Sequence, residues 1–431
     1  MNFQRFSSAL ATILIAEDWS EPSLRCRLMR FLPERHNRHA APLAKALTQR
    51  FPKFYAPSRR ALASVLCDLP QTHIVWSHAQ QHQTWPELPL EPPCFRPLPA
   101  FRDLSLPALT TRSELAEWLG LKPEQLIRFC DLNGLSNRQD HPFKPHYNFH
   151  VLPKRSGGQR LIEEPRPMLK HLQRRLLSGM LSRIPASPHA FGFVTGRNCI
   201  QGAAKHAGEQ ILLTFDLRDF FHSIPQSRLF GLFRSLGYPG AIARDLVGLT
   251  TLATPPHILR RLGPGHDNRL TNRHLPQGAP TSPALANLCA FHLDRRLAGL
   301  ARRIGATYTR YADDLSFSGD TCIARALQRA VPDIVVDDGF ALNPAKTRSA
   351  HQSQQQRCTG LVVNQHVNIP RADYDRLKAI IHHLARPSDP RRADPAFLTQ
   401  LEGRITWLEQ VNLHKGAGLR IKLAQALHPT L

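Results

Sequence analysis

The feature that most constrains the fold is an apolar, β-prone segment at residues 211–215 that ends at an acid, Asp216. A continuous run of this kind is typical of a strand buried on both faces. Two further β-rich segments, 307–311 and 315–318, flank a turn that contains the pair Asp313-Asp314, and this pattern predicts a hairpin. The chain is therefore expected to contain a sheet with carboxylates at a strand end and at a hairpin turn.

Carboxylates in these positions indicate a catalytic or metal-binding role more than a role in shaping the strand end or the turn. A buried strand seldom ends in an unpaired acid, and a tight turn is made as well by Asn-Gly or Asp-Gly. If the strand and the hairpin are neighbours in one sheet, Asp216, Asp313 and Asp314 converge. Oxygen-only ligands suit Mg²⁺, and a pair of such ions can activate a hydroxyl and neutralise a leaving pyrophosphate. On spacing alone, solvated turn acids remain the alternative.

The charge balance indicates a polyanionic partner. The 431 residues include 56 Lys and Arg against 33 Asp and Glu, a formal net charge of +23, which attracts polyphosphates or acidic membranes. No apolar run approaches the roughly 18 residues of a membrane helix, so no membrane partner is expected. The eight cysteines contain no CxxC pair and indicate reduced thiols. We therefore expect a cytoplasmic, globular protein.

Composition divides the chain into four parts. Seven prolines between residues 86 and 107 predict a linker, which ends a basic N-terminal extension at 1–107. A helical lead-in is expected at 108–145, alternating strands and helices at 146–369, and a helical region at 370–431. Finer features are also expected, namely one helix at 284–297, a second hairpin turning at 364–366, and two helices after residue 370.

Three motifs occur in order: Phe-Asp-Leu-Arg-Asp-Phe-Phe at 215–221, Leu-Pro-Gln-Gly-Ala-Pro-Thr-Ser-Pro at 275–283, and Tyr-Ala-Asp-Asp at 311–314. Together they resemble the reverse transcriptases, and the segments at 157–165 and 189–193 are similar to the fingers motifs of bacterial members. The resemblance extends from about Tyr147 to the C-terminus. It implies an α+β, right-hand polymerase fold with fingers, an antiparallel palm sheet and a helical thumb.

The resemblance also assigns roles to residues. Asp216, Asp313 and Asp314 would be the catalytic acids, and together with the main-chain carbonyl of Leu217 they would hold two Mg²⁺ ions. The implied activity is RNA-directed DNA polymerisation, in which a primer hydroxyl attacks the α-phosphate of a dNTP. The broad positive charge would hold the RNA–DNA heteroduplex through its phosphates.

A second set of positions matches the nucleotide pocket of the family: Arg160, Lys154, Phe221, Gln277, Gly278 and Lys346. A flat ring at Phe221 leaves no room for a 2′-hydroxyl and would favour deoxynucleotides. Glycine at 278 permits close approach of the backbone to a ligand. Lys346 would approach the pyrophosphate as a general acid, although an exposed loop lysine is the alternative.

Two shorter signatures are similar to those of retron reverse transcriptases. Residues 202–206, Gly-Ala-Ala-Lys-His, match Asn-Ala-x-x-His without the asparagine, and residues 358–360, Cys-Thr-Gly, match Val-Thr-Gly without the valine. The resemblance implies RNA contacts from His206, Thr359 and Gly360. Glycine at 202 cannot make a hydrogen bond that an asparagine side chain would make.

The function implied is that of an RNA-directed DNA polymerase that copies a structured noncoding RNA into the single-stranded DNA of a retron (msDNA). A role in antiphage defence alongside an effector protein is implied as well. The alternatives are a non-retron bacterial reverse transcriptase, of the diversity-generating, intron-derived or abortive-infection type, and a non-catalytic RNA-binding scaffold. The three acids favour an enzyme, and substitution of Asp313 by Asn would separate enzyme from scaffold.

Overall fold

The computed structural model describes residues 2–15, 19–32, 34–52, 57, 59–83, 94–132, 134, 145–153, 159–263 and 268–427. The chain forms two compact units, each made of two segments. Unit 1 consists of Met1–Pro185 and Phe221–Cys289, and unit 2 consists of Ala186–Phe220 and Ala290–Leu431. Each unit is described separately below.

The N-terminal part of unit 1 is helical. Its helices are α1 (Phe3–Leu14), α2 (Glu21–Phe31), α3 (Ala40–Arg50), α4 (Arg59–Asp68) and α5 (Pro70–Gln81). The side chains of Asn2 and Ser20 accept hydrogen bonds from backbone N–H groups in the first turns of α1 and α2, as good N-caps do. One core joins the helices, and Phe6, Leu28 and Leu62 are fully buried in it.

The described part of the proline-rich segment is bonded to the rest of unit 1 rather than free. The backbone N–H groups of Arg96 and Leu98 donate to the carbonyls of Gly237, at 3.0 Å, and Ser235, at 3.1 Å. A Cβ added to Gly237 would lie 2.4 Å from the nitrogen of Pro97, so only glycine allows this approach. The linker expected here therefore stays a prediction, and its described residues are held against the helix that ends at Ser235 and the turn that follows it.

The rest of unit 1 combines one hairpin with helices. Strands β1 (Tyr147–Pro153) and β2 (Gln159–Pro165) pair antiparallel. The helices of this part are α6 (Arg112–Trp118), α7 (Pro123–Cys130), α8 (Pro167–Gly179), α10 (Gln226–Ser235), α11 (Gly240–Thr250), α12 (Pro256–Leu262) and α13 (Ser282–Cys289). Arg112 on α6 binds the buried carboxylate of Asp245 on α11 through two hydrogen bonds of 2.6 and 2.9 Å, which ties the two helices together.

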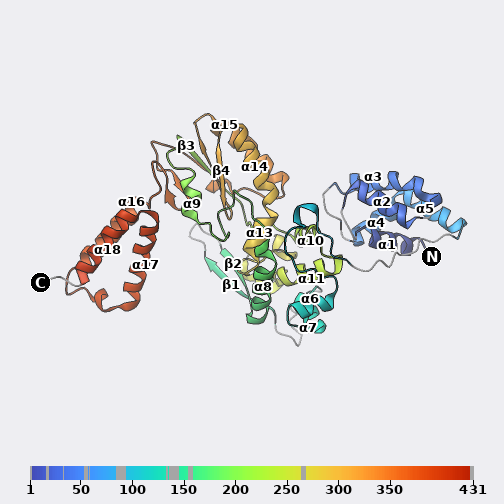
Figure 1. Ribbon diagram of the computed structural model, residues 1–431, viewed down its shortest axis with the longest axis horizontal. Coiled ribbons are helices and arrows are strands. Elements are labelled where there is room, and N and C mark those ends of the chain that lie inside the picture. Colours follow the sequence, from blue (N-terminus) through green and yellow to red (C-terminus); the bar gives the residue numbers. More distant parts are fainter. Residues whose placement is uncertain are drawn as a thin grey trace. The chain divides into compact units, whose positions relative to one another are not determined.

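Unit 2 is built on a four-stranded antiparallel sheet of order β4-β5-β3-β6. Its strands are β3 (Ile211–Asp216), β4 (Thr307–Tyr311), β5 (Asp314–Gly319) and β6 (Arg348–His351). Helices α9 (Cys199–Ala204), α14 (Phe291–Arg303) and α15 (Ile323–Asp337) belong to the same unit (Figure 1). The predicted buried strand is confirmed, since Leu213 and Phe215 of β3 are 1% and 2% exposed.

Two of the finer expectations, the helix at 284–297 and the second hairpin, differ in detail from the structure. The helix expected at 284–297 is interrupted at Ala290, which ends α13 and caps α14 at the point where the chain passes from unit 1 to unit 2. The structure also contains a hairpin that the sequence did not predict, formed by β7 (Arg357–Cys358) and β8 (Leu361–Val362). Its turn lies at residues 359–360, before the turn expected at 364–366. The expected pairing survives as an isolated bridge between Val362 and Asn368.

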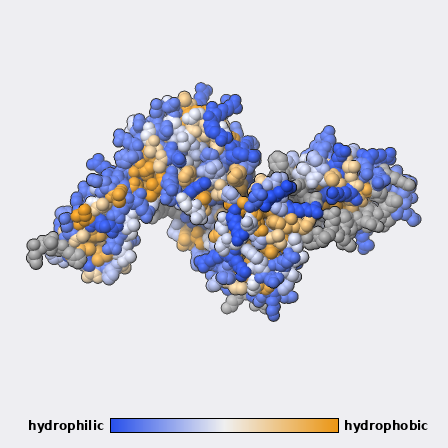
Figure 2. All heavy atoms as spheres, in the orientation of Figure 1, coloured by the Kyte–Doolittle hydropathy of each residue, from blue (hydrophilic) through white to orange (hydrophobic). Residues whose placement is uncertain are grey.

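The C-terminal region contains three helices instead of the expected two: α16 (Arg371–Leu384), α17 (Pro395–Val411) and α18 (Leu413–Leu427). Leu377, Ile405 and Leu419 lie in their common core. Hydrophobic residues also appear on the visible face of these helices (Figure 2). Leu413 and Ile421, both of α18, are 74% and 59% exposed. Among the described residues, no helix has the length and apolarity to cross a membrane.

Candidate active site

The sheet of unit 2 gathers three acids at one end. In the antiparallel pair β3–β5, Asp216 stands directly opposite Asp314. The N–H of Leu217 donates to the carbonyl of Asp313 at 2.9 Å, which joins the end of β3 to the turn between β4 and β5. The strand end and the hairpin turn that the sequence singles out thus lie next to each other.

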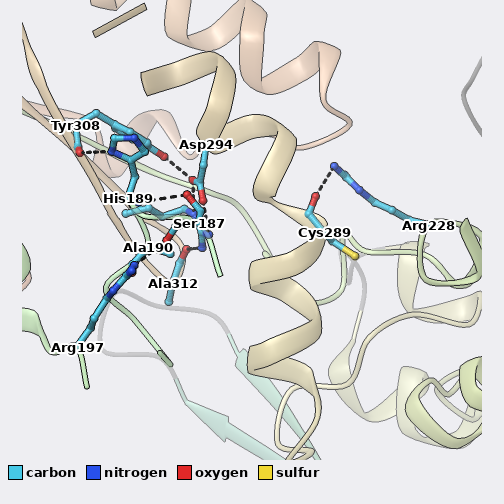
Figure 3. Close-up of polar contacts among 10 residues, drawn as sticks. Ser187, His189, Ala190, Arg197, Arg228, Cys289, Asp294, Tyr308 and Ala312 are labelled. Atoms are coloured by element: carbon cyan, nitrogen blue, oxygen red, sulfur yellow. Dashed lines mark hydrogen bonds and ion pairs between the residues drawn. The ribbon is translucent and has the colours of Figure 1, made fainter. Parts of the chain in front are cut away.

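A buried ion pair supports the turn that carries Asp313. Ala312, the first residue of the turn, has a left-handed backbone with φ of 55°. Arg310 is fully buried, donates to the carbonyl of Ala312 at 3.1 Å, and binds both oxygens of Asp294 at 2.7 Å. The hydroxyl of Tyr308 donates to the same carboxylate at 2.9 Å (Figure 3). These bonds hold the turn in its left-handed conformation at Ala312.

The segment after Ser187 supports the hairpin from the other side. Arg310 exchanges backbone hydrogen bonds of 2.8 Å with His189 and Phe191. Arg197 in turn donates to the carbonyls of Ser187, at 2.7 Å, and Ala190, at 2.8 Å (Figure 3). A separate contact in the same view, from Arg228 to the carbonyl of Cys289, belongs to unit 1.

Electrostatics at the acids favour a bound cation. Loss of hydration together with the charges of Asp313 and Asp216 raises the pKa of Asp314 to about 6, although the side chain remains exposed at the surface. The ammonium of Lys346 lies 2.7 Å from Oδ2 of Asp216, and this hydrogen bond raises the pKa of the lysine. Lys346 belongs to the short 3-10 helix η6 (Pro344–Lys346), which the N–H of Asn343 anchors to the carbonyl of Asp216.

Among the described residues, the group of three metal-ligating side chains whose ligand atoms all lie within 4.8 Å of one another is Glu163, His222 and His274, in unit 1. The three aspartates at the end of the sheet of unit 2 are not such a group.

The expected nucleotide residues that the structure describes outside the acid cluster lie in unit 1. Arg160 is exposed on β2, and Phe221 is half-buried. The N–H of Glu163 on β2 donates to the carbonyl of Gln277 at 2.8 Å, so β2 holds the Gln277-Gly278 loop. Lys154 lies outside the described residues.

The two retron signatures have different surroundings. His206 is fully buried, with its ring nitrogens 2.8 Å from the hydroxyl of Ser318 and 2.7 Å from that of Thr309, and burial lowers its pKa to about 4. This ring packs against the sheet and has no surface for RNA, so the expected contact is corrected to a structural role. Thr359 and Gly360, with φ of 48° and 84°, form the turn between β7 and β8, where Gly360 is exposed.

Sequence reasoning missed a second polar cluster. Glu163, His222 and His274 come from three distant segments and meet in the interior of unit 1. The alternation of residues along β2 offered one signal. Every second residue of a strand faces the same side, so Glu163 lies on the same face as Leu161 and Pro165, and all three are buried. A carboxylate on the apolar face of a strand needs a partner.

Comparison with known proteins identifies the relatives of this chain. The family model described as reverse transcriptase (RNA-dependent DNA polymerase) matches residues 152–363. The retron Mx65 reverse transcriptase of Myxococcus xanthus is 39% identical over 315 residues, which cover 71% of this chain and 70% of the relative. The retron Mx162 enzyme of the same organism is 34% identical over 338 residues, covering 74% and 68%. The retron Ec86 reverse transcriptase of Escherichia coli is 34% identical over 247 residues, covering 55% and 70%.

Proposed function

The chain belongs to the retron reverse transcriptases, and we propose that Asp216, Asp313 and Asp314 carry out its DNA synthesis with two Mg²⁺ ions. It is an RNA-directed DNA polymerase of retron msDNA synthesis, with an α+β fold and an antiparallel palm sheet. The observation that carries the proposal for the acids is the register of β3 and β5, which sets Asp216 opposite Asp314 beside the turn with Asp313.

The donor set fits the proposed ions. As a reverse transcriptase the chain works with divalent metal ions, and hard cations of this kind prefer carboxylate and carbonyl oxygens. The three acids and the main-chain carbonyl of Leu217 would supply them. Lys346 already places a positive charge on Asp216, which supports a site that binds cations. When bound, the ions would activate the primer hydroxyl and neutralise the leaving pyrophosphate.

The protein's own side chains would complete the reaction. Lys346 would leave Asp216 when metal binds and donate a proton to the departing pyrophosphate, since its ammonium is already within reach of the acids. Five further positions would bind the incoming dNTP: Arg160, Lys154, Phe221, Gln277 and Gly278. Of these, Phe221 would exclude ribonucleotides by contact with the sugar.

The regions of the chain would correspond to the domains of the family. Residues 146–369 would form fingers and palm and 370–431 the thumb, after a lead-in at 108–145 and a basic extension at 1–107. The partner would be a structured noncoding RNA, held with the growing DNA through phosphate contacts that the net charge of +23 favours. Thr359 and Gly360 would contact that RNA from the β7–β8 turn.

An active-site substitution tests the proposal for the acids. Asp313→Asn is expected to lower Mg²⁺-dependent incorporation of dNTPs on an RNA template by more than about 1,000-fold without unfolding the protein. Asp333→Asn, which removes an exposed acid of α15, should leave the rate unchanged. Full activity of the Asp313 variant would contradict the proposed roles.

Sequencing the nucleic acid that copurifies with the protein tests the RNA partner. We expect branched single-stranded DNA joined to a structured RNA. An active polymerase that carries no such molecule would contradict the proposed partner. The proposed antiphage role predicts that Asp313→Asn also abolishes protection in a phage plating assay, whereas retained protection would favour a non-catalytic role.

A further inference from the structure

We propose that Glu163 is a positioning residue, whose buried carboxylate holds His222 and His274 and thereby sets the nucleotide pocket. His222 directly follows Phe221, and His274 lies three residues before Gln277. The inference rests on the proposed roles of Phe221 and Gln277 in binding the dNTP. All of these residues lie within unit 1.

The carboxylate of Glu163 is fully buried and has three neighbours from other segments. Its Oε1 accepts a hydrogen bond of 2.7 Å from the hydroxyl of Thr254. Nε2 of His274 lies 3.2 Å from Oε1 and 3.1 Å from Oε2, and Nε2 of His222 lies 3.7 Å from Oε2. A single side chain of β2 thus joins the segments that contain Phe221 and Gln277.

The protonation state of His274 follows from its other nitrogen. Nδ1 lies 2.8 Å from the carbonyl of Asn272, an acceptor, so Nδ1 carries a proton. A neutral ring would then direct the lone pair of Nε2 at a carboxylate, which is repulsive. A second proton on Nε2 makes both contacts hydrogen bonds and gives an imidazolium–carboxylate pair. Burial alone would raise the pKa of Glu163, but the charges of His274 and His222 outweigh it and lower that pKa.

A bound metal ion is the other arrangement that three such ligands allow. Hydrogen bonds within the protein, however, already account for both oxygens of Glu163 and both nitrogens of His274. We therefore favour the ion pair, and metal content becomes an outcome of the test.

Backbone hydrogen bonds connect the cluster to the pocket residues. The N–H of Glu163 donates to the carbonyl of Gln277 at 2.8 Å. Leu275 donates to the carbonyl of Ile224 at 3.1 Å, and Ile224 donates to that of Phe221 at 3.1 Å. A Cβ on the next residue, Gly278, which has φ of 130°, would lie 3.1 Å from the carbonyl of Glu163. The backbone of Glu163 therefore holds the loop that contains Gln277, while its side chain holds His274 and His222.

The test compares Glu163→Gln with Asp245→Asn in the full chain. Both variants replace a buried carboxylate of unit 1 by its amide, but Asp245 pairs with Arg112 of α6 and not with His222 or His274. For Glu163→Gln we expect the KM for dNTPs to rise about 10-fold and the preference for dNTPs over rNTPs to fall about 10-fold, with kcat within about 3-fold. Asp245→Asn should lose thermal stability and retain both KM and sugar preference.

A milder variant guards against misfolding. Thr254→Val removes one hydrogen bond to Oε1 with little change of shape and should raise the KM about 2–5-fold. Wild-type KM and sugar preference in both Glu163→Gln and Thr254→Val would overturn the inference. Stoichiometric zinc in the purified wild-type protein that is lost in Glu163→Gln would also overturn it, since the cluster would then be a metal site.

Phe221→Val separates this inference from the proposed function. If Phe221→Val relaxes the sugar preference while the Glu163 and Thr254 variants do not, the positioning role alone fails. If Phe221→Val has no effect on the sugar preference, the assignment of the pocket itself fails, and the positioning role fails with it.

Discussion

Asp216 and Asp314 are partners in the antiparallel register of β3 and β5, so the two carboxylates occupy adjacent strands at the same end of the sheet. A slip of one residue in this register would send one of the side chains to the opposite face. Strand β3 is paired on both sides, with β5 and β6, which specifies the register strongly. The candidate metal site is therefore a consequence of sheet pairing.

Asp314→Asn should stabilise the metal-free protein. The pKa of Asp314 is about 6 in the folded chain against 3.8 for an ordinary aspartate, so the folded state binds more protons between these values. The free energy of unfolding of the wild type therefore falls as the pH rises from about 4 to about 6. In EDTA at pH 7.5, thermal denaturation should show a melting temperature a few degrees higher for Asp314→Asn.

The same comparison contains its own control. Near pH 4 the two proteins should melt alike, because Asp314 is protonated in the folded wild type. Equal melting temperatures at pH 7.5 would contradict the raised pKa. Added Mg²⁺ should stabilise the wild type more than the variant, because the variant lacks one proposed ligand.

Lys346→Met removes the cation that lies 2.7 Å from Asp216. Because the ammonium competes with metal for this carboxylate, the Mg²⁺ concentration that gives half-maximal activity should decrease a few-fold. The kcat should nevertheless fall by about 10–100-fold, since the proposed proton donor is lost. Metal titrations of primer extension measure both effects. Lys45→Met, on exposed surface of α3, should change neither, and an unchanged kcat in Lys346→Met would exclude the proton-donor role.

Arg310→Met should strongly destabilise the fold, because it leaves the carboxylate of Asp294 buried without its cation. Breaking a buried pair of this kind costs about 3–5 kcal/mol. Urea denaturation monitored by circular dichroism measures the loss. The double variant Arg310→Met with Asp294→Asn should recover part of it, and a loss below about 1 kcal/mol in the single variant would contradict the support assigned to this pair.

His206→Ala should reduce stability by about 1–3 kcal/mol, since two hydroxyl hydrogen bonds and a buried ring are lost. Its affinity for the copurifying RNA should stay at the wild-type value in a filter-binding assay carried out below the melting temperature. Thr359→Ala, by contrast, should weaken RNA binding if the β7–β8 turn contacts RNA. Weaker RNA binding by His206→Ala at full stability would restore the contact that the sequence suggested.

The acids at 216, 313 and 314 could be predicted because local patterns, a buried strand and a β-rich hairpin, place them at element ends. The role of His206 could not be predicted. This histidine is buried by packing between the segment after α9 and the sheet, and its sequence signature does not indicate burial. For the cluster around Glu163, the alternation along β2 indicates only that this carboxylate needs a partner. It does not identify His222 and His274, which lie tens of residues away along the chain. Contacts distant in sequence leave no periodicity to read.

The bonds of Arg310 to Asp294, to the carbonyl of Ala312 and to the backbone of His189 and Phe191 join three sequence segments into one cooperative block. Such a block opens by global unfolding and not by local fraying, so its amides should exchange with deuterium at the slowest rates in unit 2. The hairpin would then be rigid before any ion arrives. In that case the metal ions bind to a site that is already folded, and their binding does not drive folding of the hairpin.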